Sequence, residues 1–476
     1  MSHYFLQRTI ALFALVAVTF FQSPATAFAE PTSQDLLTQI QDLRRLVESQ
    51  SKLMEAQNRK IEVLESKVTV EREQARQIPL SGEVTEHIEK RLLDSKDGYM
   101  TIGGLKMEAA ATMVGQQAFN TNRNVDKKGQ SSNDAGYSID LAFEKEFDDW
   151  GRAFLHLETG DGLAGDEQTA LFSTVNRDAD DSDNFVSVTE AFYEHYLFGK
   201  QAGIRIGKID PTTSMDQNEY ANDETTQFLS SMFRNSPVID FPDNALGATL
   251  LIEPKFAPWL EVSGGFLDGD SNGVDFINSG YMFGQVNFKP TFLGENRPGN
   301  YRAYIWRNNS DHSYWGEDAT LTTRPGYGFG LSFDQKITDD IRLFTRYGWQ
   351  DRQVYLLDNA WSVGAAMEGK KWKRENDVLG IAFGQAFSGR DWRTEGNAFD
   401  PAITRKAANE KHLEIYYSWQ LNDHFTLSPN FQWIWDPYGM NTNPSSATDL
   451  TDASTVQADF SRGTVYLLGL RAQVNF

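Results

Sequence analysis

The sequence predicts an all-β protein, a transmembrane antiparallel β-barrel of about 16 strands, preceded by a short α-helical coiled coil. Three observations lead to this fold class. From about residue 99 to 476, apolar and polar residues alternate with a period of two. In the segment before residue 76, apolar residues repeat in heptads. The chain begins with an export-type segment. Aromatic residues reach 13% although the mean hydropathy is −0.49, as expected when every second strand residue faces lipid.

Residues 1–29 have the organisation of a secretory signal peptide. Arg8 supplies the positive start, Ile10 to Phe21 form an apolar core too short to span a bilayer, and Ala27–Ala29 is a small-x-small cleavage site. We expect a mature chain beginning at Glu30, with an uncleaved anchor as the alternative. No later stretch approaches the roughly 18 apolar residues of a membrane helix, so a membrane-spanning form must be a closed barrel.

A heptad pattern predicts a coiled coil within residues 30–75, followed by a linker over residues 76–98. The seam runs over about five heptads and includes two glutamines, which cost stability but fix register. The seam alone leans towards a dimer, and a single amphipathic helix lying on the barrel is the alternative. The a positions are Ile40, Val47, Met54, Ile61 and Val68, and the d positions are Leu36, Leu43, Gln50, Gln57 and Leu64.

The barrel is expected over residues 99–476. Alternation is clear over residues 137–144, 152–158, 327–334, 413–420 and 425–435. Short turns fall near residues 148–149, 199–200, 255–257, 338–339, 371–376 and 422–423. Long polar loops fall near residues 118–135, 160–183, 211–243, 268–277, 308–325, 388–410 and 437–461. This alternation is typical of outer-membrane barrels with tight periplasmic turns and long outer loops. It gives sixteen strands, the last ending at the aromatic residue Phe476.

Composition and motifs exclude several kinds of function. Asp and Glu outnumber Lys and Arg by 66 to 44, and a strongly acidic chain repels nucleic acid. The sequence has no cysteine, and outside the segment Asp268–Gly273 it has no P-loop, nucleophile elbow or zinc spacing, so we expect no enzyme activity and no cofactor. Residues Asp268–Gly273 begin like a calcium loop, but Ser279 stands where the bidentate glutamate belongs, and no metal is expected.

Several segments resemble the carbohydrate-selective porins of the OprB type. The resemblance covers about residues 98–476, and the order of the segments is more specific than any one of them. The segments are Ile206–Pro211, Asn218–Ala221, Phe228–Phe233, Gly328–Gln335, Leu343–Trp349, Asp377–Phe383 and Glu414–Tyr417.

The resemblance implies a sugar porin in the outer membrane of a Gram-negative cell. The predicted coiled coil departs from the OprB pattern and is similar in layout to the sucrose porins, which implies a homotrimer with the coiled coil in the periplasm. The loop over residues 211–243 is more acidic than the family pattern, which leaves the solute open.

Strand parity places a set of charged side chains inside the barrel, because a charge facing mid-membrane costs about 2–4 kcal/mol. Such residues offer donors and acceptors to hydroxyls or anions, and two aromatic residues of the same parity offer stacking faces. We expect the arginines at positions 302, 342 and 346 to form a ladder; the alternative is that the charges only hydrate the wall. The predicted lumen residues are Arg152, Glu190, Glu194, Arg205, Arg302, Tyr304, Trp306, Arg342 and Arg346.

The loop from Pro211 to Pro242 is expected to fold into the lumen and narrow it. Its apolar residues would pack on the inner wall while its acids face the channel. The apolar residues are Tyr220, Phe228, Leu229, Met232 and Phe233, and the acids are Asp216, Glu219, Asp223 and Glu224.

Three functions fit these features. The first is passive diffusion of small hydrophilic solutes, with sugars favoured by the resemblance. The second is an anion-selective or general porin. The third is a barrel that anchors or sheathes a partner complex through its coiled coil.

Overall fold

A computed structural model describes residues 100–122, 131–178, 184–291, 293–294, 296–315, 321–394, 409–439 and 463–476. The chain divides into two units, residues 1–89 and 90–476, and every described residue belongs to the second. The predicted signal peptide (1–29), coiled coil (30–75) and linker (76–98) lie outside the described residues.

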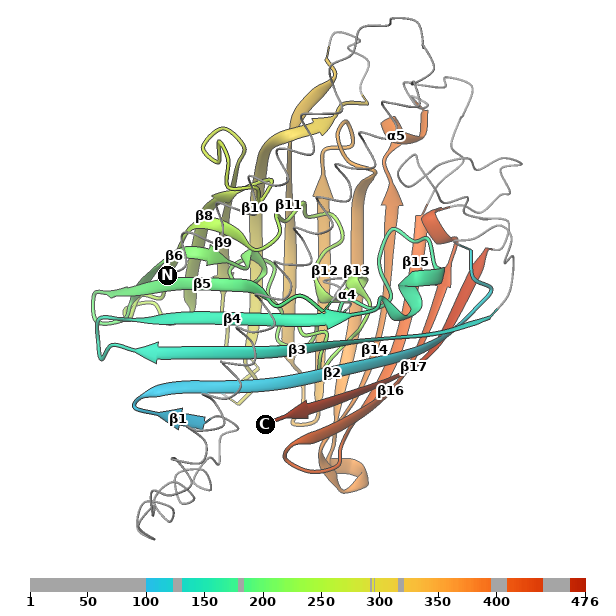
Figure 1. The fold of residues 1–476 in the computed structure, drawn as a ribbon, viewed down its shortest axis with the longest axis horizontal. Coiled ribbons are helices and arrows are strands. Elements are labelled where there is room, and N and C mark those ends of the chain that lie inside the picture. The colour runs from blue at the N-terminus through green and yellow to red at the C-terminus, as the bar shows by residue number, and fades with distance from the viewer. Residues whose placement is uncertain are drawn as a thin grey trace, which may run out of the picture. The chain divides into compact units, whose positions relative to one another are not determined.

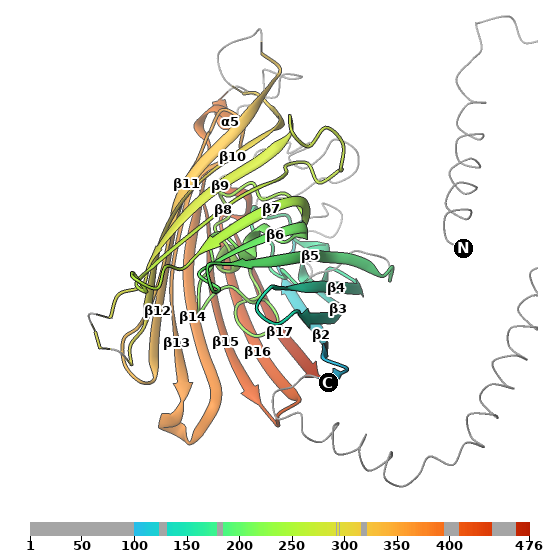
Figure 2. The same cartoon turned by 90° about the vertical axis from the view of Figure 1, so that its left-hand side faces the viewer.

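Sixteen antiparallel strands close into a barrel within the described part of the chain (Figure 1, Figure 2). Each strand from β2 to β17 pairs with its successor, and β17 closes the ring on β2 with Tyr466 opposite Phe119. The short strand β1 pairs with β2. The predicted fold class and strand number are confirmed for the barrel. The strands are β1 (Met100–Ile102), β2 (Leu105–Phe119), β3 (Ser132–Glu146), β4 (Gly151–Asp161), β5 (Ser187–Leu197), β6 (Ala202–Ile209), β7 (Ala245–Ile252), β8 (Leu260–Asp268), β9 (Gly280–Phe288), β10 (Gly299–Ser313), β11 (Thr323–Lys336), β12 (Ile341–Gln350), β13 (Leu357–Gly369), β14 (Arg374–Ser388), β15 (Asn409–Gln420), β16 (Phe425–Trp435) and β17 (Thr464–Asn475).

The period of two in the sequence sorts side chains between the two faces of the wall. On β17, Val465 and Leu467 are fully buried inside, whereas Leu468 and Leu470 point outward and are about half exposed. Successive strand residues point to opposite faces, so one strand supplies both an apolar outside and a packed inside. Among the described residues, no helix is long and apolar enough to cross a membrane.

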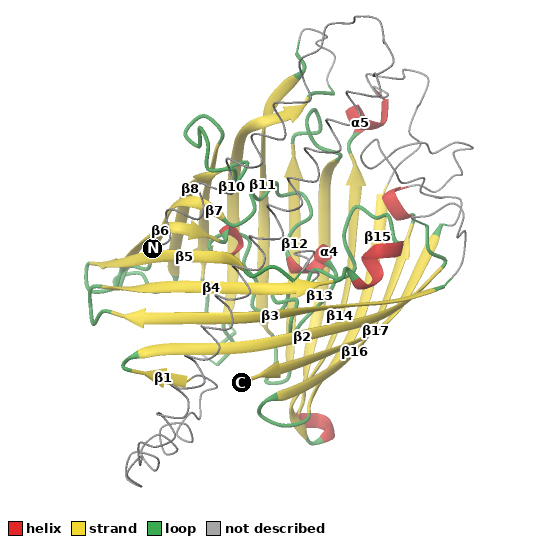
Figure 3. Cartoon of the chain, in the orientation of Figure 1, coloured by secondary structure: helices red, strands yellow, loops and turns green. Residues whose placement is uncertain are grey.

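The connections differ in length at the two ends of the barrel. One end has turns such as residues 198–201 and 421–424, and the other has long loops, the longest being residues 210–244 between β6 and β7. In the part of the chain that the structure describes, the helices are short pieces beside the strands (Figure 3). These pieces are η2 (Ala164–Gln168), η3 (Pro211–Thr213), α4 (Ser231–Arg234), η4 (Lys370–Trp372), α5 (Arg390–Thr394) and η5 (Pro437–Gly439).

Candidate functional site

The loop of residues 210–244 packs against the inner wall of the barrel. Its side chains Phe228, Met232 and Phe233 are buried in a cluster with Phe344 of β12 and Tyr416 of β15. The ring of Phe228 meets the ring of Tyr416 edge to face, with centroids 4.9 Å apart. Burial of several large apolar side chains holds this loop inside the barrel.

An arginine of β12 anchors the same loop. Arg346 is 2% exposed, and its Nε lies 3.3 Å from a carboxylate oxygen of the fully buried Asp216. Its two terminal nitrogens donate to the backbone oxygens of Phe233, at 2.5 Å, and Asp216, at 3.1 Å. The planar guanidinium therefore joins two distant points of the loop, Asp216 and Phe233, to the wall.

Glu414 of β15 provides a second anchor. Its carboxylate accepts hydrogen bonds from the backbone N–H groups of Leu229 and Ser230 at 2.8 and 2.9 Å. These groups lie at the start of helix α4, where Ser230 also caps the N–H of Met232. A carboxylate satisfies the unpaired N–H groups that a helix start leaves.

Residues 162–178, which follow β4, also enter the barrel. Glu410 of β15 accepts hydrogen bonds from the backbone N–H groups of Phe172 and Ser173, at 2.9 and 3.0 Å. It also accepts from the N–H of Tyr438, at 2.8 Å, and contacts His412 Nε2 at 2.9 Å. The sequence did not predict that this second loop folds inward.

The two inner loops bond to each other. The N–H of Arg177 donates to the oxygen of Leu229 at 2.8 Å, and the N–H of Ser231 donates to the oxygen of Thr174 at 3.0 Å. The loop of residues 210–244 packs against β12 and β15, and the segment of residues 162–178 contacts β2, β15, β16 and β17.

A cavity of about 520 Å³ remains on the opposite side, between the loops and the wall of β2 to β5. We call it the passage. In Figure 1, β3, β4 and β5 cross the front of the barrel, while β12 and β13 run upright behind helix α4. The residues lining the passage are Ala110, Asp140, His156, Glu158, Arg177, Asp178, Thr189, Glu190, Asp210, Thr212, Asn222, Asp223, Glu224, Thr225, Thr226, Arg234, Asn244, Gln473 and Asn475.

Several charged side chains on the loop and on the neighbouring wall of β3 to β6 form ion pairs. On the loop, Arg234 Nε lies 2.7 Å from Glu224. On the wall, Arg152 pairs with Glu144 at 2.5 Å and with Glu194 at 2.7 Å, and Arg205 lies 3.4 Å from Glu194. A mixed row of fixed charges offers a passing solute both hydrogen-bond donors and acceptors.

The carboxyl group of Asp178, in the loop that follows β4, has a raised pKa. Burial raises the pKa of Asp178 well above its usual range, and the nearby carboxylates of Glu224 and Asp140 raise it further. The hydroxyl of Ser138 donates to it at 3.2 Å, which opposes the rise. Asp178 is therefore neutral over a wider pH range than an exposed aspartate.

The predicted lumen residues divide into two groups. Arg152, Glu190, Glu194 and Arg205 lie on the wall of β4 to β6, and Glu190 lines the passage. The others lie on β10 and β12, where the loop of residues 210–244 covers much of the wall. Solute contact by the first group stays a prediction.

The second group differs from the expected ladder. Arg302 is 6% exposed and pairs with Asp334 at 2.5 Å, and Arg346 is held under the loop. Arg342, which is partly exposed, pairs with Glu368 and lies over the ring of Tyr220, 5.6 Å from its centroid. These arginines bind protein groups that parity alone does not reveal.

Tyr304 and Trp306 are 2% and 3% exposed, so they present no face on which a sugar could stack. Their partners across the strand pair are Gly330 and Gly328 of β11. A Cβ atom at Gly328 would lie 2.6 Å from the Trp306 ring, so the glycine leaves room for the ring to lie flat on the strand. Both rings fill the wall.

The acids of the long loop also divide. Asp216 is fully buried against Arg346, which corrects the expectation that it faces the channel. Glu219 is exposed, and Asp223 and Glu224 line the passage. Tyr220, Phe228 and Phe233 are buried, as their apolar character led us to expect.

Sequence reasoning missed several residues of this region. Glu410, Glu414, His156 and Asp140 all stand at inward positions of their strands, so parity could have found them. Arg471 of β17 also stands at an inward position of its strand. It donates to the backbone oxygens of Glu224 and Gln227 at 2.6 and 2.9 Å.

The calcium-like segment of residues 268–273 uses its carboxylates locally. Asp268 accepts from the N–H of Gly273 at 2.7 Å and from the hydroxyl of Ser279 at 3.3 Å. Asp270 accepts from the side-chain amide of Asn272 at 2.7 Å. These bonds are those of an ordinary polar turn.

Comparison with known proteins identifies the family. Residues 106–476 match the carbohydrate-selective porin family OprB. The high-pH structure of OprB from Pseudomonas putida superposes with a TM-score of 0.64 at 15% identity, covering 83% of this chain and 96% of that one. The low-pH structure of the same protein gives a TM-score of 0.46 at 14% identity, covering 83% and 98%.

A curated relative matches a smaller part of the chain. An uncharacterized protein of Aquifex aeolicus (strain VF5) is 26% identical over 237 residues, which span 50% of this chain and 60% of that protein. The family match covers far more than half of the chain and spans the whole ring of strands. The chain therefore belongs to the OprB family of carbohydrate-selective porins, and it is an outer-membrane β-barrel channel, not an enzyme.

Proposed function

We propose that this protein lets small hydrophilic solutes, chiefly carbohydrates, diffuse passively across the outer membrane. The observation that carries the proposal is the passage of about 520 Å³, which the two inner loops leave open beside the wall of β2 to β5. Its volume lies within the roughly 300–1,000 Å³ of small-molecule sites. Carboxylates, guanidinium groups, amides and threonine hydroxyls line it, and all of them exchange hydrogen bonds with sugar hydroxyls.

Conduction needs contacts that are weak enough to release the solute. Arg234, which lines the passage, meets that need, because it is already paired with Glu224 and offers a solute only its remaining donors. Carbohydrate-selective family membership supports sugars as the solute class.

Liposome swelling tests the proposal. Vesicles containing the purified protein are expected to swell in isotonic monosaccharide and disaccharide solutions and to swell more slowly as the sugar grows. Vesicles with a heat-denatured sample of the same protein are the control. No swelling with any sugar would contradict the proposal and favour a barrel that anchors or sheathes a partner.

An anion-selective or general porin is the second candidate, and the lining of the passage argues against anion selectivity. Seven acidic residues line it, against the two arginines Arg177 and Arg234. Even with Asp178 neutral, acids dominate, and charge close to the narrow zone has the greatest effect on ions. The acids are Asp140, Glu158, Asp178, Glu190, Asp210, Asp223 and Glu224.

We therefore expect the open channel to prefer cations and the substitution Glu190→Gln to weaken that preference. Glutamine keeps the oxygen that accepts from the N–H of Asp210, at 3.1 Å in the native chain, but removes the charge. The measurement is the reversal potential in a potassium chloride gradient. Asp149→Asn, at a turn where the side chain is 96% exposed, is the matched control and should leave the potential unchanged. An anion-selective wild-type channel would contradict this expectation.

We further propose a homotrimer with a periplasmic coiled coil over residues 30–75, behind a signal peptide of residues 1–29. The support is the heptad seam and the export-type start of the sequence. Both segments lie outside the residues that the structure describes.

A further inference from the structure

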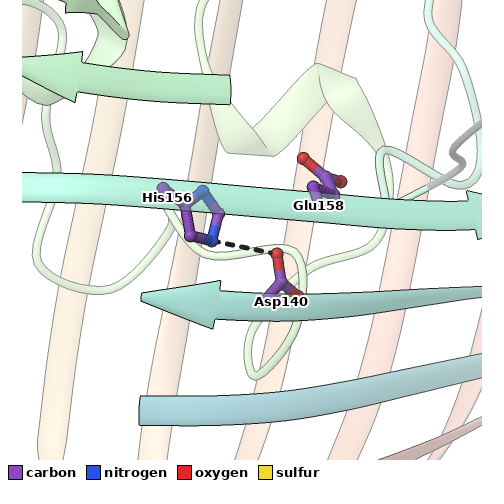
Figure 4. A group of neighbouring side chains, drawn as sticks. All are labelled: Asp140, His156 and Glu158. Atoms are coloured by element: carbon purple, nitrogen blue, oxygen red, sulfur yellow. Dashed lines mark ion pairs between the residues drawn. The ribbon is translucent and has the colours of Figure 1, made fainter. Parts of the chain in front are cut away.

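Three metal-ligating side chains meet on the wall of the passage. Asp140 of β3 and His156 and Glu158 of β4 stand on neighbouring strands (Figure 4). One ligand atom from each lies within 4.8 Å of the others, and His156 Nε2 is 3.2 Å from Asp140 Oδ1. All three line the passage, and the side chains of His156 and Asp140 are 23% and 24% exposed. An ion in the passage can therefore reach them.

The strand register brings negative charges together here. Asp140 stands directly opposite Glu158, and His156 stands opposite Glu190 of β5. Like charges directly opposite on neighbouring strands are destabilising. A bound divalent cation would remove the repulsion between Asp140 and Glu158 without displacing either strand.

A threonine holds the histidine ring in the orientation that a metal ligand needs. Thr189 Oγ1 lies 2.6 Å from His156 Nδ1 and also donates to the backbone oxygen of His156 at 3.4 Å. A hydroxyl that donates to the carbonyl accepts from Nδ1–H, so in the neutral ring Nε2 carries the lone pair. Metal-bound histidines commonly donate their other ring nitrogen in this way.

That tautomer aims the Nε2 lone pair at the carboxylate of Asp140. Two lone pairs at this distance repel unless a proton or a metal ion lies between them. A proton gives a simple ion pair of protonated His156 with Asp140. A metal ion gives a site with one nitrogen and two oxygen ligands, the set that zinc and its neighbours accept.

We propose that Asp140, His156 and Glu158 form a three-ligand site for a divalent transition-metal ion on the wall of the passage, and that an ion bound there obstructs the passage. Three protein ligands leave coordination positions open to water. In a tetrahedral zinc site with bonds of about 2.1 Å, ligand atoms lie about 3.4 Å apart. The three ligand atoms lie within 4.8 Å of one another, so their separations exceed that spacing by at most about 1.4 Å.

Zinc is the probe for the test, with magnesium as the comparison ion. Single-channel current through the wild-type protein is expected to fall on addition of Zn²⁺ but not of Mg²⁺, which prefers six oxygen ligands. The half-blocking Zn²⁺ concentration should rise by roughly 10–100-fold in Thr189→Val, which loses only the supporting hydroxyl. It should rise further in His156→Gln and in Glu158→Gln. His195→Gln is the matched control, because this histidine has outward parity on β5 and should leave the block unchanged.

Zinc binding is measured separately by competition with a chromogenic chelator in detergent. Wild type should bind one more ion per chain than His156→Gln, and each variant must first migrate as a folded barrel on unheated gels. Because this measurement needs no open channel, it is independent of whether sugars pass. Equal binding or equal block in wild type and His156→Gln would overturn the proposal and leave a protonated His156–Asp140 ion pair. Binding without any loss of current would equally overturn it.

Discussion

Replacement of Arg346 with alanine is expected to destabilise the barrel and to raise its single-channel conductance. The guanidinium and its partner carboxylate on Asp216 are both fully buried. Breaking a buried ion pair by removing one partner typically costs about 3–5 kcal/mol, because an uncompensated charge remains. The backbone oxygens of Phe233 and Asp216 also lose their donors, so the loop of residues 210–244 should loosen from the wall and widen the channel.

The midpoint of thermal unfolding in detergent and the conductance in planar bilayers measure the two effects. Arg352→Ala is the control, because Arg352 is 49% exposed and pairs with Asp391 at 3.3 Å, and exposed pairs contribute little. Arg346→Lys should recover part of the stability, since lysine keeps the charge but not the fork. An unchanged melting temperature and conductance in Arg346→Ala would mean that the apolar contacts alone hold the loop.

This expectation replaces the one that the sequence suggested. Parity assigned Arg346 to the inside of the barrel, and that assignment agrees with the structure. From the sequence alone we expected the arginine to contact solute through hydroxyls or anionic groups. The structure instead places the loop over it, so the loss of Arg346 should appear as a change of pore width before any change of solute affinity.

Strand number and facing were predictable because both follow from local rules. A period of two sorts residues between lipid and interior, and a one-residue slip would reverse every side chain. Turn and loop lengths then fix the order of the strands. The inward direction of Arg152, Glu190 and Arg205 follows from the same rules, and each lies on the inner wall.

Contacts between a loop and a distant strand were not predictable in this way. Glu414 bonds to Leu229, which lies 185 positions earlier, and no local pattern links the two. The sequence showed only that Glu414 is a charged residue at an inward position of its strand. Solute binding and loop anchoring explain such a residue equally well. The apolar run in the loop did predict its inward fold, since five large apolar residues would be costly in water. The loop of residues 162–178 has a shorter apolar stretch, residues 170–172. Besides the burial of Val175, it is held by hydrogen bonds between its backbone and the wall side chains Glu410 and Gln432.

Those bonds lead to the last expected result, that Glu410→Ala releases the loop of residues 162–178 from the wall. Glu410 is fully buried and accepts from the backbone N–H groups of Phe172, Ser173 and Tyr438. Hydrogen bonds to a charged acceptor contribute about 1.5–3 kcal/mol each. Alanine leaves three backbone donors without their acceptor, and the two in the loop, on Phe172 and Ser173, regain partners only if the loop moves into water.

Limited proteolysis of the folded barrel measures this release, and Glu410→Ala should be cut within the loop faster than wild type. Conductance should rise as well, because Arg177 and Asp178 of this loop line the passage. Glu375→Ala, at an exposed position near the start of β14, should change neither. Glu410→Gln is the sharper comparison: its size is nearly unchanged, but its amide nitrogen cannot accept from an N–H group. If Glu410→Gln resists proteolysis as well as wild type, the charged carboxylate of Glu410 does not hold the loop. The packing of Phe172 against Trp392 and Tyr438 then holds it instead.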